Sequence, residues 1–258
     1  VIDVLQHALN NPSLLTPAAR IRVYRRLAGQ YHNLRTGDGN DENLTRASEY
    51  YSKALNEVST SNWERVDPAT LFELARVYKL TISGERQANL RNALQLCHLI
   101  LEKIEEDAEA PSRGEVLQTL GAWYRNLSDF EDALENLRKS ITALQDAAEY
   151  FIRHSLLMNY AGVMVDLGLT YSRIADYTDP IGNRQQAVDA YQQALRYRTA
   201  EAAPFAQATV LSNIGYTLYR VGRLTGQIEV LQNGLLNLEE AQRIRNPETS
   251  PLGYSTVL

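Results

Sequence analysis

The sequence is poor in the residues on which metal, redox and disulfide chemistry depend. It contains one cysteine, Cys97, and four histidines in 258 residues. A single cysteine excludes an internal disulfide and a cysteine zinc cluster. The histidines, at positions 7, 32, 98 and 154, show no His-x-x-x-His spacing, so we expect packed or exposed side chains rather than metal ligands. The sequence therefore predicts a protein without a metal or cofactor.

Charge and hydropathy argue against two further classes of protein. With 26 basic and 31 acidic residues the formal net charge is −5, whereas a nucleic-acid-binding domain is typically basic. No apolar run approaches the roughly 20 residues that a membrane-spanning helix needs. We therefore expect neither nucleic acid nor a membrane as a partner. The single cysteine favours a reducing compartment, which we expect to be the cytoplasm.

Catalytic signatures are also missing from the sequence. It contains no Gly-Lys-Ser/Thr phosphate loop and no Gly-x-Ser-x-Gly nucleophile elbow. Cys97 falls on a stripe of apolar residues with helical spacing, and we interpret it as a core residue rather than a nucleophile. The sequence predicts a protein that is not an enzyme.

One repeated pattern dominates the chain. A small residue preceded by Leu or Ile recurs at Ala28, Ala75, Gly121, Gly168 and Gly215, at intervals of 47, 46, 47 and 47 residues. A Tyr follows three residues later in the first four copies, and a Leu in the fifth. A shared period of this size is typical of a stacked array of helical hairpins.

The first half of each copy carries one apolar stripe with the spacing of a helix. In the fourth copy the stripe consists of Met164, Leu167, Gly168 and Tyr171. A Gly inside a helix costs roughly 1 kcal/mol relative to Ala. Its recurrence at the same repeat position therefore predicts that two helices approach each other closely there.

The second half of each copy alternates small and bulky residues. The pattern is clearest in Ala47-x-x-x-Tyr51-x-x-Ala54-Leu55, and the same pattern starts at Ala187. Together, Leu/Ile-Gly/Ala-x-x-Tyr and Ala-x-x-x-Tyr-x-x-Ala-Leu resemble the tetratricopeptide repeat, although the family's usual Trp is missing from the first helix. The resemblance implies an all-α protein, a right-handed α-solenoid of about five helical hairpins.

The expected domain is a single array over residues 1–258. We predict hairpins at about 17–60, 67–107, 112–147, 155–200 and 206–245, with partial hairpins at 1–11 and 251–258. We expect the array to continue in both directions. The period exceeds the 34 residues of the minimal tetratricopeptide repeat. Stretches such as those from Gly84 and Gly182 resemble the long repeats of bacterial signalling proteins, where such arrays are fused to a CHAT-type protease or a STAND-type NTPase.

The resemblance also implies where a partner would bind, because in this family the first helices line the inner, concave surface. Helical geometry gives five inward positions in each first helix. Seven of these 25 positions hold Arg or Lys and one is acidic, in a chain that is acidic as a whole. We expect the following groove residues: Arg22, Arg25, Phe72, Arg76, Lys79, Arg125, Asn126, Arg173, Tyr216, Tyr219 and Arg220.

This basic groove predicts a scaffold or sensor module that binds an acidic peptide or protein segment by charge. The effector domain of the signalling protein would then lie elsewhere. Two alternatives remain open. Lys79, Arg125, Arg173 and Arg220 are predicted to lie in the last turns of their helices, where cations complement the helix dipole. The array could also be an architectural or oligomerisation arm with no ligand in its groove.

Overall fold

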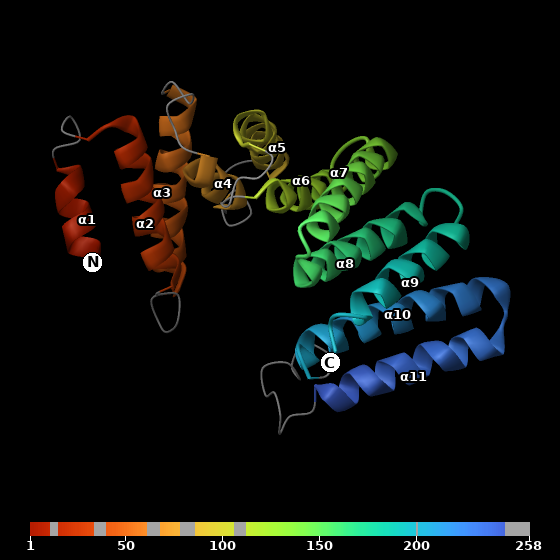
Figure 1. Cartoon of the computed structure of the whole chain (residues 1–258). Coiled ribbons are helices and arrows are strands. Elements are labelled where there is room, and N and C mark those ends of the chain that lie inside the picture. The colour runs from red at the N-terminus through yellow and green to blue at the C-terminus, as the bar shows by residue number, and fades with distance from the viewer. Residues whose placement is uncertain are drawn as a thin grey trace. The chain divides into compact units, whose positions relative to one another are not determined.

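A computed structural model describes residues 1–10, 15–33, 40–60, 68–77, 86–105, 112–199 and 201–245 (Figure 1). Every regular element within these residues is a helix, which confirms the all-α prediction. The chain forms two compact units, Val1–Leu127 and Ser128–Leu258. The helices are α1 (Ile2–Leu9), α2 (Pro17–Asn33), α3 (Asn40–Thr60), α4 (Pro68–Val77), α5 (Arg86–Lys103), α6 (Arg113–Leu127), α7 (Ala133–Arg153), α8 (Leu157–Ile174), α9 (Gly182–Leu195), α10 (Pro204–Thr225) and α11 (Ile228–Ile244).

Neighbouring helices pair as hairpins within each unit. In unit 1, α2 packs on α3 and α4 on α5, and in unit 2, α8 packs on α9 and α10 on α11. Helix α1 falls in the partial hairpin expected at 1–11, whereas the one expected at 251–258 lies outside the described residues. Helix α7 runs to Arg153, beyond the end at residue 147 that the sequence predicts.

The recurring glycines of unit 2 lie where two helices touch. A β-carbon on Gly168 of α8 would stand 2.3 Å from the ring of Tyr191 on α9, which is 1% exposed. A β-carbon on Gly215 of α10 would stand 2.7 Å from the carbonyl oxygen of Gly234 on α11. The close helix approach predicted from the glycine pattern is therefore confirmed in both hairpins.

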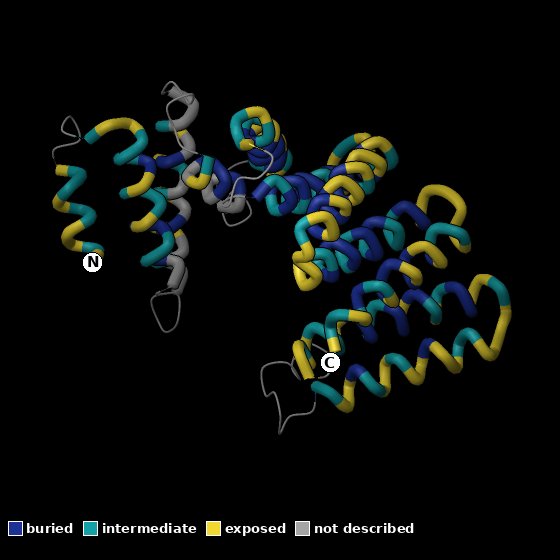
Figure 2. Tube along the Cα trace, viewed as in Figure 1, coloured by how far each residue is buried: buried dark blue, intermediate teal, exposed yellow. Residues whose placement is uncertain are grey.

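The apolar stripes form the cores of the two units, and Figure 2 shows buried residues running along α8 and α10. In unit 1, Leu27 and Ala28 of α2 pack with Ala47 of α3, and Leu5 of α1 covers this cluster. In unit 2, Leu195 of α9 packs on the cluster that α10 forms with α11. In each unit, apolar side chains of one hairpin are thus buried against its neighbour, as a stacked array requires.

The repeat Tyr links consecutive hairpins by a hydrogen bond. In three copies its hydroxyl contacts a Gln or His that lies 25 or 26 residues earlier, on the preceding second helix. The pairs are Gln6 with Tyr31 (3.0 Å), His98 with Tyr124 (2.8 Å), and Gln145 with Tyr171. The repeat Tyr therefore forms a polar bond between neighbouring repeats, and in the first copy, at Tyr31, its ring is also buried in the core.

We expect Tyr171→Phe to lower the free energy of unfolding by about 1 kcal/mol, since it removes this hydrogen bond and keeps the ring. Urea denaturation measures the change. Tyr177→Phe is the matched control, because Tyr177 is 56% exposed and its replacement should change stability little. Equal stability of Tyr171→Phe and the control variant would contradict the linking role.

A capping box fixes the start of α6. The Ser112 hydroxyl accepts a hydrogen bond from the Glu115 amide (3.2 Å), and the Glu115 carboxylate accepts one from the Ser112 amide (2.9 Å). This reciprocal pair satisfies two amide donors at the helix end. It gives a structural reason for Glu115, the one acid among the predicted inward positions.

Cys97 is fully buried in α5, and burial raises the pKa of its thiol to about 12. At pH 8 roughly one thiol in ten thousand would then be ionised, and only the thiolate is nucleophilic. We expect no reaction of the folded protein with a disulfide reagent at pH 8 and complete reaction in denaturant, followed by absorbance. Rapid labelling of the folded protein would show that the thiol is accessible.

None of the described helices is both long and apolar enough to cross a membrane.

Candidate functional site

The predicted groove residues of unit 1 differ in how far their side chains are exposed. On α2, the side chain of Arg22 is exposed and that of Arg25 is partly buried. Phe72, expected to line the groove, is only 8% exposed in α4, so its ring offers a partner little surface. Arg76 belongs to α4, but its side chain lies outside the described part of the chain, as does the whole of Lys79.

Arg125 and Asn126 lie near the end of α6 with partly buried side chains. Arg125 is in the last turn of α6, and Arg173 is in the last turn of α8. For these two residues, compensation of the helix dipole remains a sufficient explanation. It does not apply to Arg220 as predicted, because α10 continues to Thr225 and its last turn holds Arg223 instead.

Unit 2 brings together three of the predicted residues, Tyr216, Tyr219 and Arg220, at one cavity of about 510 Å³. We call it the Tyr–Arg pocket. The two rings are 58% and 43% exposed, so both present surface to a ligand. The pocket lies beside α10, the start of α9 and the residues that follow α8. Its full lining is Ala175, Asp176, Pro180, Arg184, Tyr216, Tyr219, Arg220, Arg223 and Leu224.

Two cation–π pairs stand side by side on α10. The guanidinium carbon of Arg220 lies 6.0 Å from the centre of the Tyr216 ring, and that of Arg223 lies 5.8 Å from the Tyr219 ring. Each ring face thus holds a guanidinium whose N–H groups can still donate to an acceptor. The hydrogen bond with Tyr216 and the charge of Asp176 raise the pKa of Arg220 above its ordinary value, so this side chain stays charged.

A buried arginine forms part of the base of the Tyr–Arg pocket. The side chain of Arg184 is 4% exposed and lies 2.5 Å from the Asp176 carboxylate. It also donates a hydrogen bond to the carbonyl oxygen of Pro180 (2.7 Å). Arg220 contacts the same Asp176 oxygen at 2.8 Å. The lining therefore contains three guanidinium groups and a single carboxylate, an arrangement that favours an anionic ligand.

The ion pair of Arg220 repeats one hairpin earlier. Arg173 and Arg220 both lie five residues after the repeat glycine, and each pairs with an aspartate 44 residues before it. Arg173 contacts Asp129 at 2.9 Å, as Arg220 contacts Asp176. Each aspartate lies in the loop that follows the first helix of the preceding hairpin. These pairs therefore link consecutive hairpins. The charge of these two predicted groove arginines is therefore partly neutralised in unit 2.

We expect Asp176→Asn to lower the free energy of unfolding by about 1–2 kcal/mol, because it leaves the buried Arg184 guanidinium without its carboxylate. Asp129→Asn is the matched control. It breaks an exposed pair, which typically contributes only about 0–1 kcal/mol. Thermal unfolding of both variants makes the comparison, and an equal or larger loss in the control would contradict this role of Asp176.

Sequence reasoning missed Arg184, Arg223 and Asp176. Arg184 starts a second helix and carries no inward signal, since its burial depends on how residues 175–181 fold against α9. The sequence did contain one signal for Arg223. It follows Tyr219 by one helical turn, as Arg220 follows Tyr216, and this spacing places each arginine beside a tyrosine.

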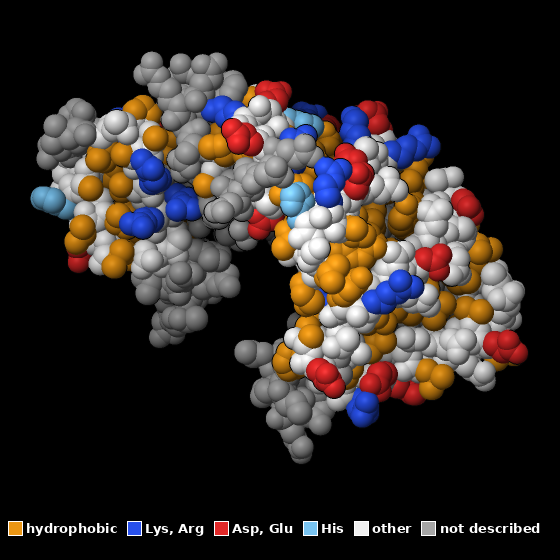
Figure 3. All heavy atoms as spheres, in the orientation of Figure 1, with side chains coloured by type: hydrophobic (Ala, Val, Ile, Leu, Met, Phe, Trp, Pro, Cys, Tyr) orange, Lys and Arg blue, Asp and Glu red, His pale blue; other side chains and the backbone are white. Residues whose placement is uncertain are grey.

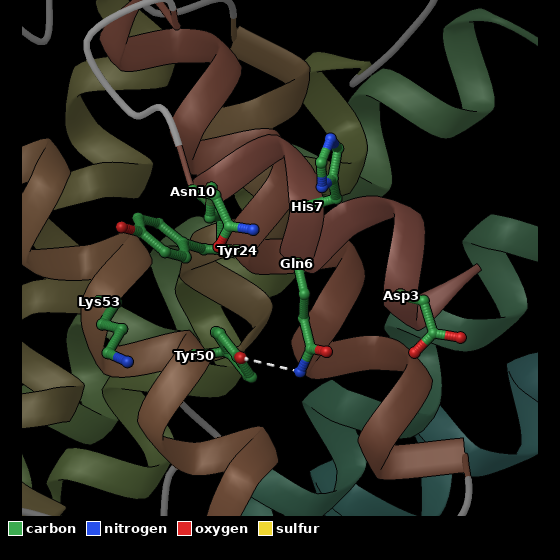
Figure 4. A pocket seen from close by; sticks show the side chains of 8 residues that line it. Asp3, Gln6, His7, Asn10, Tyr24, Tyr50 and Lys53 are labelled. Atoms are coloured by element: carbon green, nitrogen blue, oxygen red, sulfur yellow. Dashed lines mark hydrogen bonds between the residues drawn. The ribbon is translucent and has the colours of Figure 1, made fainter.

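A second, aromatic cavity lies in unit 1, between α1, α2 and α3 (Figure 4). It measures about 610 Å³. Tyr50 stacks between Tyr24 and Tyr31, at centroid distances of 6.3 and 5.7 Å, and Gln6 donates a hydrogen bond to the Tyr50 hydroxyl. The ammonium of Lys53 lies 5.1 Å from the Tyr50 ring. The rings of Tyr24 and Tyr50 therefore stack within an aromatic cluster and also line the cavity.

Among the residues that the structure describes, no group of three or more His, Cys, Asp and Glu side chains lies close enough to hold a metal ion. No Ser, Thr, Cys, His or Lys is among the described residues that line the Tyr–Arg pocket.

The fold is similar to that of solved helical-repeat proteins. BtubC (BKLC) from P. vanneervenii matches 90% of this chain and 91% of its own, with 17% identity and a TM-score of 0.50. Two structures of a putative kinesin light chain with nearly identical TPR-like repeats from Podosopora anserina match 89% and 88% of this chain and 99% of their own. Their identities are 15% and 16%, with TM-scores of 0.57 and 0.56.

These similarities confirm the predicted tetratricopeptide-like fold. Comparison with protein-family models gave no match, and comparison with curated proteins also gave none.

Proposed function

We propose that this chain of tetratricopeptide-like fold is a non-enzymatic recognition scaffold that binds an acidic segment of a partner protein. The observation that carries the proposal is the Tyr–Arg pocket, where two exposed tyrosines and three guanidinium groups face one cavity with a single carboxylate. Arg and Tyr are among the residue types enriched at the energetic centres of protein interfaces.

In this proposal, Arg223 and Arg220 hold a carboxylate of the partner segment. A guanidinium presents its N–H groups as a fork that matches the two oxygens of a carboxylate. Arg220 and Arg184 already share Asp176, whereas Arg223 faces only the Tyr219 ring in the contacts described. Arg223 is therefore the guanidinium best able to donate hydrogen bonds to a new carboxylate. Leu224, which is 56% exposed, offers an apolar contact beside it.

The proposal keeps further contact residues at the inward repeat positions expected from the sequence. They are Arg22, Arg25, Arg76 and Lys79 on the first two repeats, and Arg125, Asn126 and Arg173 on the next two. The Arg and Lys residues among them would attract an acidic partner over a longer range and raise the association rate, and the Asn126 amide could form a hydrogen bond with it. We also propose that the array is the docking arm of a larger cytoplasmic signalling protein whose effector domain lies elsewhere.

A peptide array tests the proposal. The chain is exposed to acidic and matched neutral peptides in about 50 and 200 mM salt, since charge-driven binding weakens as salt screens it. The expected result is selective retention of acidic peptides, weaker at the higher salt. Equal retention of acidic and neutral peptides, or binding independent of salt, would contradict the proposal.

A second candidate function is an oligomerisation arm, and one observation favours it. Helix α11 exposes large apolar side chains, with Ile228 at 68%, Leu235 at 56% and Leu236 at 61%. Leu195 occupies the same repeat position as Leu235 in the preceding second helix, α9, and it packs against the next hairpin. Light scattering at increasing protein concentration tests this function. A rising mass that Leu235→Glu abolishes would support it, and a constant mass would exclude it.

A further inference from the structure

We infer that unit 2 carries a second docking surface, of opposite charge, for a basic and apolar peptide segment. The surface is a cavity of about 410 Å³ between the second helices α7 and α9, with α8 as its base. We call it the second-helix groove. None of its lining residues belongs to the Tyr–Arg pocket, so the inference stands independently of the function proposed above.

The walls of the second-helix groove are held in place by side-chain hydrogen bonds to its base. Tyr160 of α8 donates to the Gln193 side chain of α9 at 2.5 Å, and Tyr171 of α8 bonds to Gln145 of α7. Burial raises the pKa of both tyrosines, so they remain neutral donors and acceptors at neutral pH. A preformed groove loses less conformational entropy when a ligand binds.

The charge of the groove is negative. Glu149 projects from α7 and Asp189 from α9, and no Lys or Arg is present among the described residues that line it. Glu149 pairs with Arg153 one turn away at 2.9 Å, with both side chains more than half exposed, and Asp189 accepts a hydrogen bond from Gln185. Exposed pairs of this kind are weak, at about 0–1 kcal/mol, so a ligand cation can compete for the carboxylates.

An exposed apolar patch adjoins the groove and shares Ile152 with it. The side chains of Ile152, Leu156, Leu157 and Met158 are 54%, 41%, 42% and 49% exposed. Hydrophobic side chains gather on the surface where α7 ends and α8 begins (Figure 3). Apolar clusters rimmed by polar groups mark docking sites more often than isolated exposed residues do.

These features together favour one kind of occupant, an extended segment with an Arg or Lys next to a bulky apolar residue. The cation would lie between Glu149 and Asp189, while its aliphatic stem covers Ala148 and Ala190. The neighbouring apolar side chain would cover the patch around Ile152. The side-chain amides of Gln145 and Gln186 can both donate to and accept from the peptide backbone.

The equivalent cavity of unit 1 differs at the positions that matter. Tyr50 and Lys53 lie three and six residues after Ala47, as Ala190 and Gln193 do after Ala187. Unit 1 therefore has a ring where unit 2 has a methyl group, and a cation where unit 2 has an amide (Figure 4). A basic ligand should thus select the groove of unit 2.

Selection from random heptapeptides displayed on phage tests the inference. Each enriched peptide is titrated by fluorescence polarisation against the wild-type chain and against a Glu149→Gln/Asp189→Asn variant. A Glu135→Gln/Glu240→Gln variant is the matched control, since it removes two exposed carboxylates that do not line the groove. Circular dichroism melts confirm that all three proteins are folded.

The expected result is a class of peptides that pair Lys or Arg with a bulky apolar residue. Their affinity should fall about tenfold or more in the groove variant, as loss of a charged contact predicts, and stay unchanged in the control. It should also be unaffected by Arg223→Glu, which acts on the Tyr–Arg pocket alone. The inference is overturned if no peptide class depends on Glu149 and Asp189, or if Leu157→Ser leaves the binding of all such peptides unchanged.

Discussion

Replacing Gly215 by alanine is expected to lower the free energy of unfolding by about 2 kcal/mol. Overpacking against a backbone atom costs the upper end of roughly 1–3 kcal/mol, and the gain in helix propensity offsets only about 1 kcal/mol of this. The new β-carbon would stand 2.7 Å from the carbonyl oxygen of Gly234. A backbone atom cannot rotate away as a side chain can. Helices α10 and α11 would therefore have to separate along their contact. Urea denaturation followed by circular dichroism measures the change.

The same substitution at Gly29 provides the control, with an expected change of opposite sign. Gly29 lies within α2, and a β-carbon there would meet nothing within 4 Å. Alanine should raise the free energy of unfolding by roughly 1 kcal/mol, because it only restricts the unfolded backbone and favours the helix. If Gly215→Ala were as stable as the wild type, the close approach of α10 and α11 would not hold.

Replacing Tyr216 by alanine is expected to weaken the binding of an acidic peptide about tenfold or more, as loss of an aromatic anchor at an interface does. The ring is 58% exposed and supports Arg220 by a cation–π contact. Arg223→Glu should weaken binding further, since it places a carboxylate opposite the ligand's own. Fluorescence polarisation with the strongest acidic array peptide measures both effects.

Arg243→Glu is the matched control for Arg223→Glu. Arg243 lies on α11 with a side chain that is 77% exposed. Its replacement by Glu changes the charge by the same two units, away from the Tyr–Arg pocket. If Arg243→Glu weakened peptide binding as much as Arg223→Glu does, binding would depend on the net charge of the protein rather than on the Tyr–Arg pocket. Unchanged binding by Tyr216→Ala would show that the rings of the pocket are not contact residues.

Much of the fold follows from the sequence because its signals are local and repeat in phase. A Gly at the same helical position in three copies predicts close packing, and Gly168 and Gly215 lie at such contacts. The Tyr three residues later predicts a core ring. Its hydrogen bond to a Gln or His was not predicted, because the partner lies on the preceding hairpin and its position depends on how hairpins stack.

The candidate site could be predicted only in part. Helical spacing places Tyr216, Tyr219 and Arg220 on one face of α10, and these residues do line one cavity. The partners that set its electrostatics come from elsewhere in the chain. Asp176 lies after α8, and Arg184 is buried at the start of α9. Phe72 was predicted to line the groove, but its ring is buried. Helical spacing alone does not reveal that other residues cover it.

Charge exchange between the chain and its ligand tests most directly whether the Tyr–Arg pocket binds an acidic segment. The acidic residue of the strongest array peptide is replaced by Lys, and this peptide is titrated against Arg223→Glu. We predict that the exchanged pair recovers affinity to within about threefold of the original pair, although each single change weakens it, as direct contact requires. If the exchanged pair binds no better than the sum of the two single changes allows, Arg223 does not contact the acid and the proposed site is wrong.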